Sequence, residues 1–307
     1  MAEAGTSQHE SSSSPFTDDA ARQALTRACQ FAGVDARQVE LIRMGSNAVY
    51  RVDGDVIARV APTARLLANA EKQIGVARWL EAVDYPATRA CGVTQPVEAE
   101  GRVVTFWKSV SRETVYAPIH EVAALIKRLH VMAPPADVEL PELQPFGRLD
   151  DHLPAFAGLP AADVQFLRQR IDWARDAFPR LPFALPPGPI HGDANVGNVI
   201  CDDHGRAVLI DLDSFATGAR EWDLIQTALF ADRLGWHSVE EYRTFVDAYG
   251  YDITGWVGYS DLADMREIAM TSWVGKKAEA SRDAAVEAVK RIQAIRTGAS
   301  RRDWGAY

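Results

Sequence analysis

The sequence predicts an α+β protein with a small, strand-rich N-terminal lobe and a larger, mainly helical C-terminal lobe. Its 307 residues exceed a typical single domain, so two lobes are expected. Short apolar runs separated by turn residues fill residues 39–60, whereas apolar residues recur at helical spacing in most segments after residue 117. The expected divisions are a disordered tail over 1–17, the small lobe over 18–109 and the large lobe over 110–307.

Composition narrows the classes of function. A hydrophobic content of 47% and a charged content of 24% are typical of globular proteins in water. The net charge of −9 argues against nucleic acid as a partner. Three scattered cysteines without metal-ligand spacing fit reduced thiols in a cytosol. No apolar run approaches the roughly 20 residues that span a bilayer, and no signal-peptide pattern is visible, so we expect a cytoplasmic protein without a membrane partner.

The small lobe is expected to combine helices with short antiparallel strands. Thr17 could cap a first helix that runs to about Gly33. Asp53-Gly54 is a strong hairpin signal between two apolar runs. A second helix is expected over residues 64–83. The expected strands cover residues 39–44, 49–52, 56–60, 91–98 and 102–106.

The large lobe is expected to be mostly helical. Ser238 and Glu241 form a capping box, and Gly298 stops the last helix. The expected helices cover residues 117–130, 163–178, 221–234, 238–249, 261–274 and 284–296. Residues 134–160 are proline-rich and irregular, either a solvated loop or part of the acceptor side, and contain Asp150-Asp151-His152. Five aromatic residues are expected in the core: Trp236, Tyr242, Trp256, Tyr259 and Trp273. The tail over 301–307 could be loose or could close a groove.

The most informative stretch begins with His191-Gly192-Asp193 and continues to Asn198. An apolar run follows Asn198, a turn covers residues 202–205, and a second apolar run ends at Asp211. Such a hairpin would hold Asn198 and Asp211 close together, with Asp193 on the loop just before. An amide and a carboxylate are hard oxygen ligands that suit Mg²⁺, and the remaining carboxylate could accept a hydroxyl proton. This is the layout of a phosphoryl-transfer site, although single Asn, Asp and Gly residues are also common in plain turns.

The pattern His-Gly-Asp-x4-Asn, followed by Ile210-Asp211, resembles the aminoglycoside phosphotransferase family. The resemblance implies a bilobal protein-kinase-like fold, ATP or GTP as the phosphate donor, and a small hydroxylated acceptor. It also implies that Asp193 is the catalytic base and that Asn198 and Asp211 bind Mg²⁺. The resemblance covers about residues 39–298.

In the small lobe the resemblance points to nucleotide-binding residues. The turn at Gly45 takes the place of a phosphate-covering loop, where the backbone amides of Ser46 and Asn47 could approach a phosphate. The sequence has no G-x-G-x-x-G here, and a plain hairpin turn fits equally. Arg59 stands where kinases usually place a lysine, and arginine binds phosphate well. The segment Trp107-Lys108-Ser109 resembles the interlobe hinge whose backbone contacts the base.

Two residues compete to be the partner of Arg59. The family's partner is a glutamate on the following helix, and Glu71 has that chemistry. However, the expected inward stripe of Val76, Ala77, Leu80 and Val83 extends back to Gln73, while Glu71 points away from it. We therefore predict an Arg59–Gln73 polar pair.

Further residues are expected to support the site. His191 should shape the loop by hydrogen-bonding the backbone, and Asp213 could touch metal or acceptor if the chain stays extended after Asp211. By resemblance Asp223 is a buried carboxylate that braces the catalytic loop, with helix N-capping as the local alternative. His130 is expected to be structural.

We therefore expect a magnesium-dependent kinase of a small molecule. The expected acceptor is an antibiotic of the aminoglycoside or nucleoside (capuramycin-like) class, with a role in resistance or self-protection. A kinase of a primary metabolite such as a sugar, choline or homoserine is the alternative within that class. Two interpretations from other classes stay open: a non-catalytic nucleotide-binding module, and a metal hydrolase built on His191 and Asp193.

Overall fold

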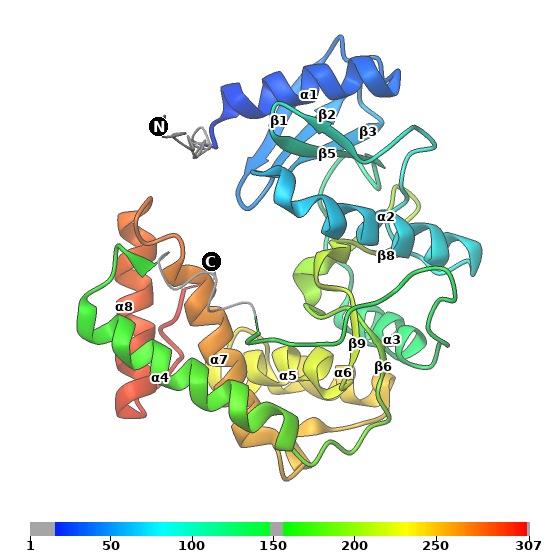
Figure 1. Cartoon of the computed structure of the whole chain (residues 1–307). Helices are drawn as coiled ribbons and strands as arrows, with labels where there is room; N and C mark the ends of the chain where they lie inside the picture. Colours follow the sequence, from blue (N-terminus) through cyan, green and yellow to red (C-terminus); the bar gives the residue numbers. More distant parts are fainter. Residues whose placement is uncertain (1–15, 148–155, 306–307) are drawn as a thin grey trace, which may run out of the picture. The chain divides into compact units, whose positions relative to one another are not determined.

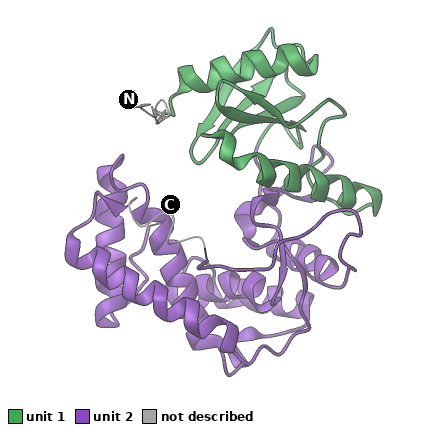
Figure 2. Cartoon of the chain, viewed as in Figure 1, with its two compact units in different colours: residues 1–113 green, residues 114–307 purple. Residues whose placement is uncertain are grey.

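The computed structural model describes residues 16–147 and 156–305. The chain forms two compact units, residues 1–113 (unit 1) and residues 114–307 (unit 2), coloured separately in Figure 2. Most of the predicted tail and all of Asp150-Asp151-His152 lie outside the described residues.

Unit 1 is built on a five-stranded antiparallel sheet with the strand order β1-β2-β3-β5-β4. Its strands are β1 (Val39–Met44), β2 (Ala48–Val52), β3 (Val56–Val60), β4 (Val97–Ala99) and β5 (Arg102–Lys108). Its helices are α1 (Asp18–Ala32) and α2 (Leu67–Ala82), the latter preceded by a 3₁₀ turn, η1 (Ala64–Leu66). Figure 1 shows α1 lying across the strands.

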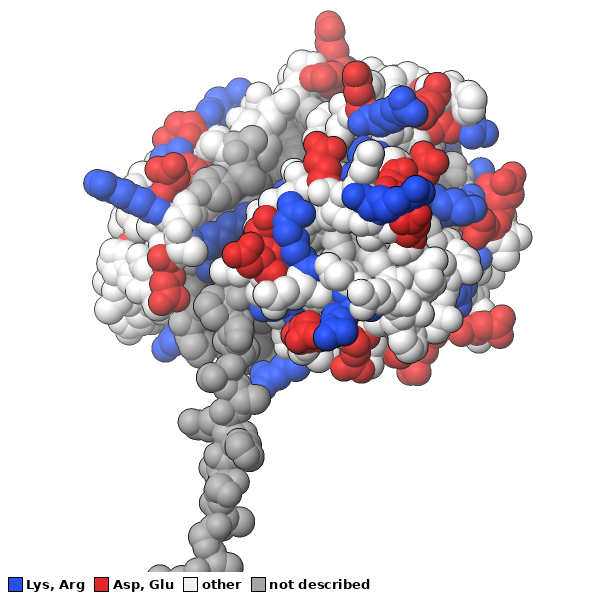
Figure 3. Space-filling model, turned by 90° about the horizontal axis from the view of Figure 1, so that it is seen from above, with Lys and Arg blue, Asp and Glu red and all other residues white. Residues whose placement is uncertain are grey.

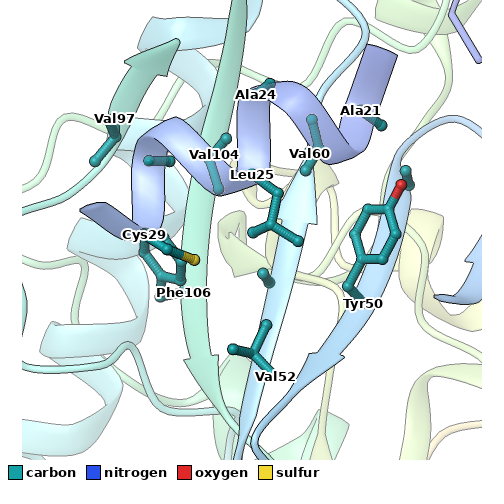
Figure 4. Packing of buried hydrophobic residues seen from close by; sticks show 13 residues of the cluster. Ala21, Ala24, Leu25, Cys29, Tyr50, Val52, Val60, Val97, Val104 and Phe106 are labelled. Atoms are coloured by element: carbon teal, nitrogen blue, oxygen red, sulfur yellow. The ribbon is translucent and has the colours of Figure 1, made fainter. Parts of the chain in front are cut away.

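The core of unit 1 lies between α1 and one face of the sheet. In Figure 4, Leu25 and Cys29 of α1 point toward Tyr50, Val60 and Phe106 of the strands. Helix α1 forms here because Thr17 accepts a hydrogen bond from the Ala20 N–H at its start and Gly33 adopts a left-handed conformation at its end. Burial raises the pKa of the Cys29 thiol to about 11, so this side chain packs as a neutral group.

The predicted strand over 91–98 is wrong for most of its length, because β4 covers only Val97–Ala99. The side chain of Gln95 takes the place of strand backbone here. Its amide nitrogen donates to the carbonyls of Cys91 and Phe106, and its Oε1 accepts from the Phe106 N–H at 2.7 Å. Because the Gln95 side chain already hydrogen-bonds the N–H and the carbonyl of Phe106, these two groups are satisfied without a neighbouring strand.

Helix α2 agrees with the prediction except at its end. Gln73, Val76, Ala77 and Leu80 are buried as expected, but Val83 is exposed. Val83 is the residue that follows the last helical position, so the helical spacing that would turn it inward does not apply to it.

Unit 2 is mainly helical. Its helices are α3 (Ile119–His130), α4 (Ala161–Ala177), α5 (Glu221–Leu229), α6 (Val239–Tyr249), α7 (Tyr259–Gly275) and α8 (Arg282–Thr297), and a π-helical segment, Phe230–Leu234, continues α5. Short antiparallel pairs join β6 (Gly188–Ile190) to β9 (Ala216–Gly218) and β7 (Val199–Cys201) to β8 (Ala207–Leu209). In Figure 1, α4, α7 and α8 form one group, consistent with their mutual packing. The α+β prediction is confirmed.

Two expectations for the C-terminal part change. Trp256 is buried as expected, but Trp273 is 41% exposed and has the Lys277 ammonium over its ring. The tail is docked rather than loose up to residue 305: Trp304 is buried beneath the Arg291 guanidinium, and the Gly305 N–H donates to Glu287. A buried indole ring stabilises this docking by removing apolar surface from water.

The surface carries both signs of charge. On the face shown in Figure 3, acidic and basic side chains lie next to one another. Within residues 16–147 and 156–305, no helix is long and apolar enough to cross a membrane.

Candidate active site

The segment from His191 to Asp211 is placed by two short strand pairs of unit 2. Strand β6 ends at Ile190 and leads into His191, and β7 begins directly after Asn198. The β7–β8 pair joins Val199 to Leu209, and the Ile210 N–H donates to the Asn198 carbonyl at 2.9 Å. The predicted hairpin is therefore present, and it brings the backbone that carries Asn198 next to the backbone that leads to Asp211.

Asp193 and Asn198 are in direct contact. The Asn198 amide nitrogen donates to the Asp193 backbone carbonyl at 2.8 Å and to the Asp193 carboxylate oxygen Oδ2 at 3.1 Å. The side chain of Asp193 is 44% exposed. Because the amide nitrogen of Asn198 faces Asp193, its oxygen faces elsewhere and is the atom of this side chain that could ligate a cation.

Asp211 adopts a left-handed backbone conformation with φ of 62°. Aspartate is one of the few residues other than glycine that tolerates this region, and such outliers concentrate at functional sites. The chain does not stay extended after Asp211, because Leu212–Ser214 forms a 3₁₀ turn. The argument that placed Asp213 on the same side as Asp211 is therefore wrong.

His191 shapes the loop, as predicted. Its ring is buried, with Nε2 2.9 Å from the Ile210 carbonyl and Nδ1 accepting the Asp193 N–H at 3.3 Å. A carbonyl oxygen only accepts, so these contacts assign the ring proton to Nε2. The imidazole thus links the loop that carries Asp193 to the strand that leads to Asp211.

Asp223 on α5 holds the backbone of the loop that carries Asp193. Its Oδ2 accepts from the His191 N–H at 2.7 Å and from His130 Nε2 at 3.0 Å, and its Oδ1 accepts from the Gly192 N–H at 2.7 Å. Full burial raises the pKa of the Asp223 carboxyl. The hydrogen bond from His130, the electrostatic effect of both histidine rings and the hydrogen bond from the His191 N–H lower it by more, so the net pKa lies below the usual value for aspartate. Asp223 lies inside α5, where Arg220 is the N-cap residue, so the N-capping alternative is wrong.

His130 completes this support. Its Nδ1 lies 2.8 Å from the Tyr249 hydroxyl, so a buried chain of contacts runs from α6 through the end of α3 to Asp223. The expectation that His130 is structural agrees with this position.

Sequence reasoning missed Arg266 on α7. Its Nη2 donates to Asp193 Oδ1 at 2.5 Å and also to Gln226 Oε1, and its guanidinium lies 4.9 Å from the centre of the Trp222 ring. Arg266 is only 6% exposed. An arginine in the middle of a helix, 73 residues from its partner, carries no local signal of such a contact.

In unit 1 the predicted polar pair is present. Arg59 Nη1 donates to Gln73 Oε1 at 3.4 Å, whereas Glu71 is exposed. The strand alternation explains the direction of Arg59: its neighbours Ala58 and Val60 are buried under α1, so Arg59 projects from the opposite face of the sheet.

The other predicted nucleotide-binding residues also lie in unit 1. Ser46 is exposed and Asn47 half-buried in the turn between β1 and β2, where the Gly45 N–H donates to the Asn47 carbonyl. Trp107 is buried, and its indole N–H donates to the Thr105 hydroxyl. The N–H groups of Lys108 and Ser109 donate to the carbonyls of Arg89 and Asp55, so a nucleotide base would need other partners in this segment.

The donor set of unit 2 fits magnesium in kind. The side-chain oxygens of Asn198 and Asp211 are hard ligands, and Mg²⁺ usually takes few protein ligands because it keeps several waters and binds substrate phosphates. Across the described residues, no group of three or more His, Cys, Asp or Glu side chains could hold a metal ion; Asn198 is not among those residue types.

Comparison with known families decides the assignment. A sequence model of the phosphotransferase enzyme family (APH) matches residues 38–267. The chain belongs to this family. It is therefore a phosphotransferase of the APH family, and the resemblance of its His191–Asp211 stretch to that family is confirmed. A search of curated proteins found no match.

Solved structures of related kinases share the fold of this APH-family chain. An amicoumacin kinase bound to AMP-PNP, Ca²⁺ and Ami superposes with a TM-score of 0.70 at 14% identity, covering 92% of this chain and 95% of that one. Aminoglycoside phosphotransferase APH(3'')-Id from Streptomyces rimosus gives 0.61 at 20% identity, covering 84% and 99%. Choline kinase LicA from Streptococcus pneumoniae gives 0.61 at 16% identity, covering 88% and 97%. The kinase-like fold is confirmed.

Proposed function

We propose that this APH-family protein is a magnesium-dependent kinase that moves the γ-phosphate of ATP or GTP to a hydroxyl of a small molecule in the cytoplasm. The observation that carries the proposal is the Asp193 carboxylate, which is part-exposed and hydrogen-bonded to Asn198 at 3.1 Å. A carboxylate that is accessible on one side and fixed on the other suits a general base.

Asp193 takes the proton of the acceptor hydroxyl. As the acceptor oxygen bonds to the γ-phosphorus, the bond from that phosphorus to the β–γ bridging oxygen breaks, and the nucleoside diphosphate leaves. His191 and Asp223 keep the loop in place, because together they engage three of its backbone groups: the N–H groups of His191, Gly192 and Asp193.

Asn198 and Asp211 are the residues that would hold Mg²⁺. When bound, the ion neutralises charge on the donor phosphates. Structural neighbours are complexes with AMP-PNP and Ca²⁺ or with GDP, which supports a nucleotide and a divalent ion as the cofactors of this chain. We propose magnesium because the site offers few protein oxygens, which suits an ion that keeps several waters and binds donor phosphates.

Unit 1 supplies the donor-binding residues in this proposal. Arg59 binds donor phosphates, and Gln73 orients the Arg59 guanidinium. A glutamate would orient the guanidinium by charge, whereas the amide oxygen of Gln73 does so by accepting a hydrogen bond. Ser46 and Asn47 would offer backbone amides to the phosphates, and the segment of Trp107, Lys108 and Ser109 would contact the base.

An antibiotic is the favoured acceptor. The neighbouring structures include kinases named for amicoumacin, spectinomycin and aminoglycosides, which supports resistance or self-protection as the role. A primary metabolite is the second candidate, because a choline kinase has the same fold at a similar TM-score. Nucleoside antibiotics of the capuramycin type stay on the panel of acceptors.

A non-catalytic nucleotide-binding module and a metal hydrolase are less well supported. The side chains of Asp193, Asn198 and Asp211 are all intact, and the buried support of the loop through Asp223 is complete. The ring nitrogens of His191 face Ile210 and Asp193 backbone, which leaves this residue ill-suited to the ligand role that the hydrolase needs.

The test is a phosphotransfer screen with ATP and GTP, each with Mg²⁺, against antibiotics and small alcohols, read by mass spectrometry. We expect one acceptor to gain one phosphate with the wild type and none with Asp193→Asn. Asp203→Asn is the matched control, because Asp203 is an exposed carboxylate on the β7–β8 turn. Nucleotide binding without transfer to any acceptor would favour the binding module, and acceptor cleavage without nucleotide would favour the hydrolase.

A further inference from the structure

The ion pair between Arg266 and Asp193 joins a buried side chain to a part-exposed one. The Arg266 side chain is 8% exposed, whereas that of Asp193 is 44% exposed. The arginine therefore lies behind the carboxylate, and the carboxylate forms the accessible end of the pair.

The carboxylate of Asp193 is held from two sides. Oδ1 accepts from Arg266 Nη2 at 2.5 Å, and Oδ2 accepts from the Asn198 amide at 3.1 Å. A carboxylate rotates freely about its last bond unless both oxygens are engaged. An ionised carboxylate has about four acceptor positions, so two remain for an acceptor hydroxyl.

Arg266 is itself anchored on α5, the helix that braces the catalytic loop. Its guanidinium donates to Gln226 and lies over Trp222 at 4.9 Å, and the Trp222 indole N–H donates to the Gly192 carbonyl at 2.9 Å. The residue that orients the carboxylate and the residues that hold the loop backbone are thus attached to the same element.

Resting on the proposed function, we propose that Arg266 is a positioning residue for phosphoryl transfer: its buried guanidinium fixes the orientation of the Asp193 carboxylate toward the acceptor hydroxyl. One guanidinium nitrogen, Nη2, donates to both Asp193 and Gln226, while the guanidinium lies over the Trp222 ring. A lysine ammonium could donate to both oxygens but cannot stack on the indole as a planar group does. A misplaced catalytic group can cost about 100-fold in rate, which sets the expected size of the effect.

The main experiment compares steady-state kinetics of wild type, Arg266→Lys and Arg266→Ala with MgATP or MgGTP and whichever panel acceptor the wild type phosphorylates. We expect kcat to fall about 100-fold in Arg266→Ala, with the KM for nucleotide changed less than about threefold. Arg266→Lys should recover only part of the loss. Added guanidinium ion, at concentrations well below denaturing, should restore part of the Arg266→Ala activity.

Arg291→Ala is the matched control. Arg291 is also a buried arginine of unit 2; its Nε donates to Glu287 at 2.8 Å and its guanidinium lies 4.9 Å from the Trp304 ring. Arg291→Ala should lower the melting temperature without a comparable fall in kcat of the folded protein, and guanidinium should not activate it. Equal loss of kcat in both variants, or no guanidinium rescue of Arg266→Ala, would overturn the inference.

Crystal structures of the wild type and Arg266→Gln separate this inference from the proposed function. If the wild type phosphorylates nothing, the proposed function fails but the structures still test the positioning. A rotated or disordered Asp193 carboxylate in Arg266→Gln supports the inference. A carboxylate with unchanged orientation and order overturns it, even in an active enzyme.

Discussion

At the scale of single residues, Asp223 makes several buried polar contacts with the loop that carries Asp193 and with α3. It accepts from the backbone of His191 and Gly192 and from the ring of His130. In Asp223→Asn, one of the carboxylate oxygens becomes an NH₂ group that faces a donor. We expect the free energy of unfolding at neutral pH to fall by about 3 kcal/mol, measured by urea denaturation, whereas Asp203→Asn on the exposed turn should change it little.

The pH dependence of that loss follows from the lowered pKa of Asp223. A carboxyl whose folded-state pKa lies below its unfolded value of about 3.9 contributes its full stability above that value and loses it as the pH falls through the folded-state pKa. The difference between wild type and Asp223→Asn should therefore be constant from about pH 5 to 8 and shrink below about pH 4. A difference that grows on acidification would contradict the ionised state of Asp223.

Gly192 is required by both its backbone and its surroundings. It has φ of +83°, and a Cβ there would lie 2.2 Å from the Ser214 carbonyl oxygen. Gly205, on the β7–β8 turn, has a similar φ of +77° but open space around it. We expect Gly205→Ala to cost about 1 kcal/mol, the ordinary penalty of a left-handed alanine, and Gly192→Ala to cost several-fold more and to abolish transfer. Thermal melts and the phosphotransfer assay on both variants check this.

The residue scale also shows what a sequence can reveal about a site. Asp193, Asn198 and Asp211 could be proposed from sequence because one loop and one hairpin carry them within a short stretch. The hydrogen bonds of Asp223 to that loop were expected from the family resemblance alone. Arg266 was not found, because its contact with Asp193 depends on how α7 packs on α5, and its own neighbours in the chain look like any helix. The expectation for Asp213 was wrong for the opposite reason. Local spacing suggested an extended chain after Asp211, whereas the backbone forms a 3₁₀ turn there.

At the scale of elements, capping signals predicted helices better than apolar runs predicted strands. Thr17, Gly33, Ser238 and Gly298 all occupy the predicted cap positions. The run from residue 91 failed as a strand because the Gln95 side chain pairs with Phe106, a long-range choice that no periodicity encodes. Caps act through residues three or four positions away, so local sequence contains the whole interaction.

Helix α6 offers an element-scale prediction. Ser238 accepts from the Glu241 N–H at 3.1 Å and the Glu241 carboxylate accepts from the Ser238 N–H at 2.7 Å. Ser238→Ala should lower the free energy of unfolding by about 1 kcal/mol and the melting temperature by about 2–4 °C, without changing kcat. Thr244→Ala in the same helix removes an exposed hydroxyl that bonds to the Glu240 carbonyl, and it should be nearly neutral. Equal effects of the two variants would show that the cap does not stabilise α6.

At the scale of the whole molecule, the proposed donor-binding residues lie in unit 1 and the proposed metal ligands in unit 2. A donor that binds to the folded chain and not to the unfolded chain should stabilise it against unfolding. At a hundredfold excess over its dissociation constant, MgATP or MgGTP should add about 2.7 kcal/mol to the free energy of unfolding. The measurement is a thermal melt with nucleotide alone, with nucleotide plus Mg²⁺, and after chelation by EDTA.

Variants in each unit separate the two contributions. Asp211→Asn should remove the increment that depends on Mg²⁺ and retain the increment from nucleotide alone, because the lost carboxylate is the proposed charged metal ligand. Arg59→Gln should reduce both increments, since it removes the cation expected at the donor phosphates. Asp203→Asn should match the wild type in all three conditions. Binding stabilises the folded state through the contacts that the folded state makes with the ion. If the Mg²⁺ increment survives in Asp211→Asn, the Asp211 carboxylate makes no such contact and is not a ligand.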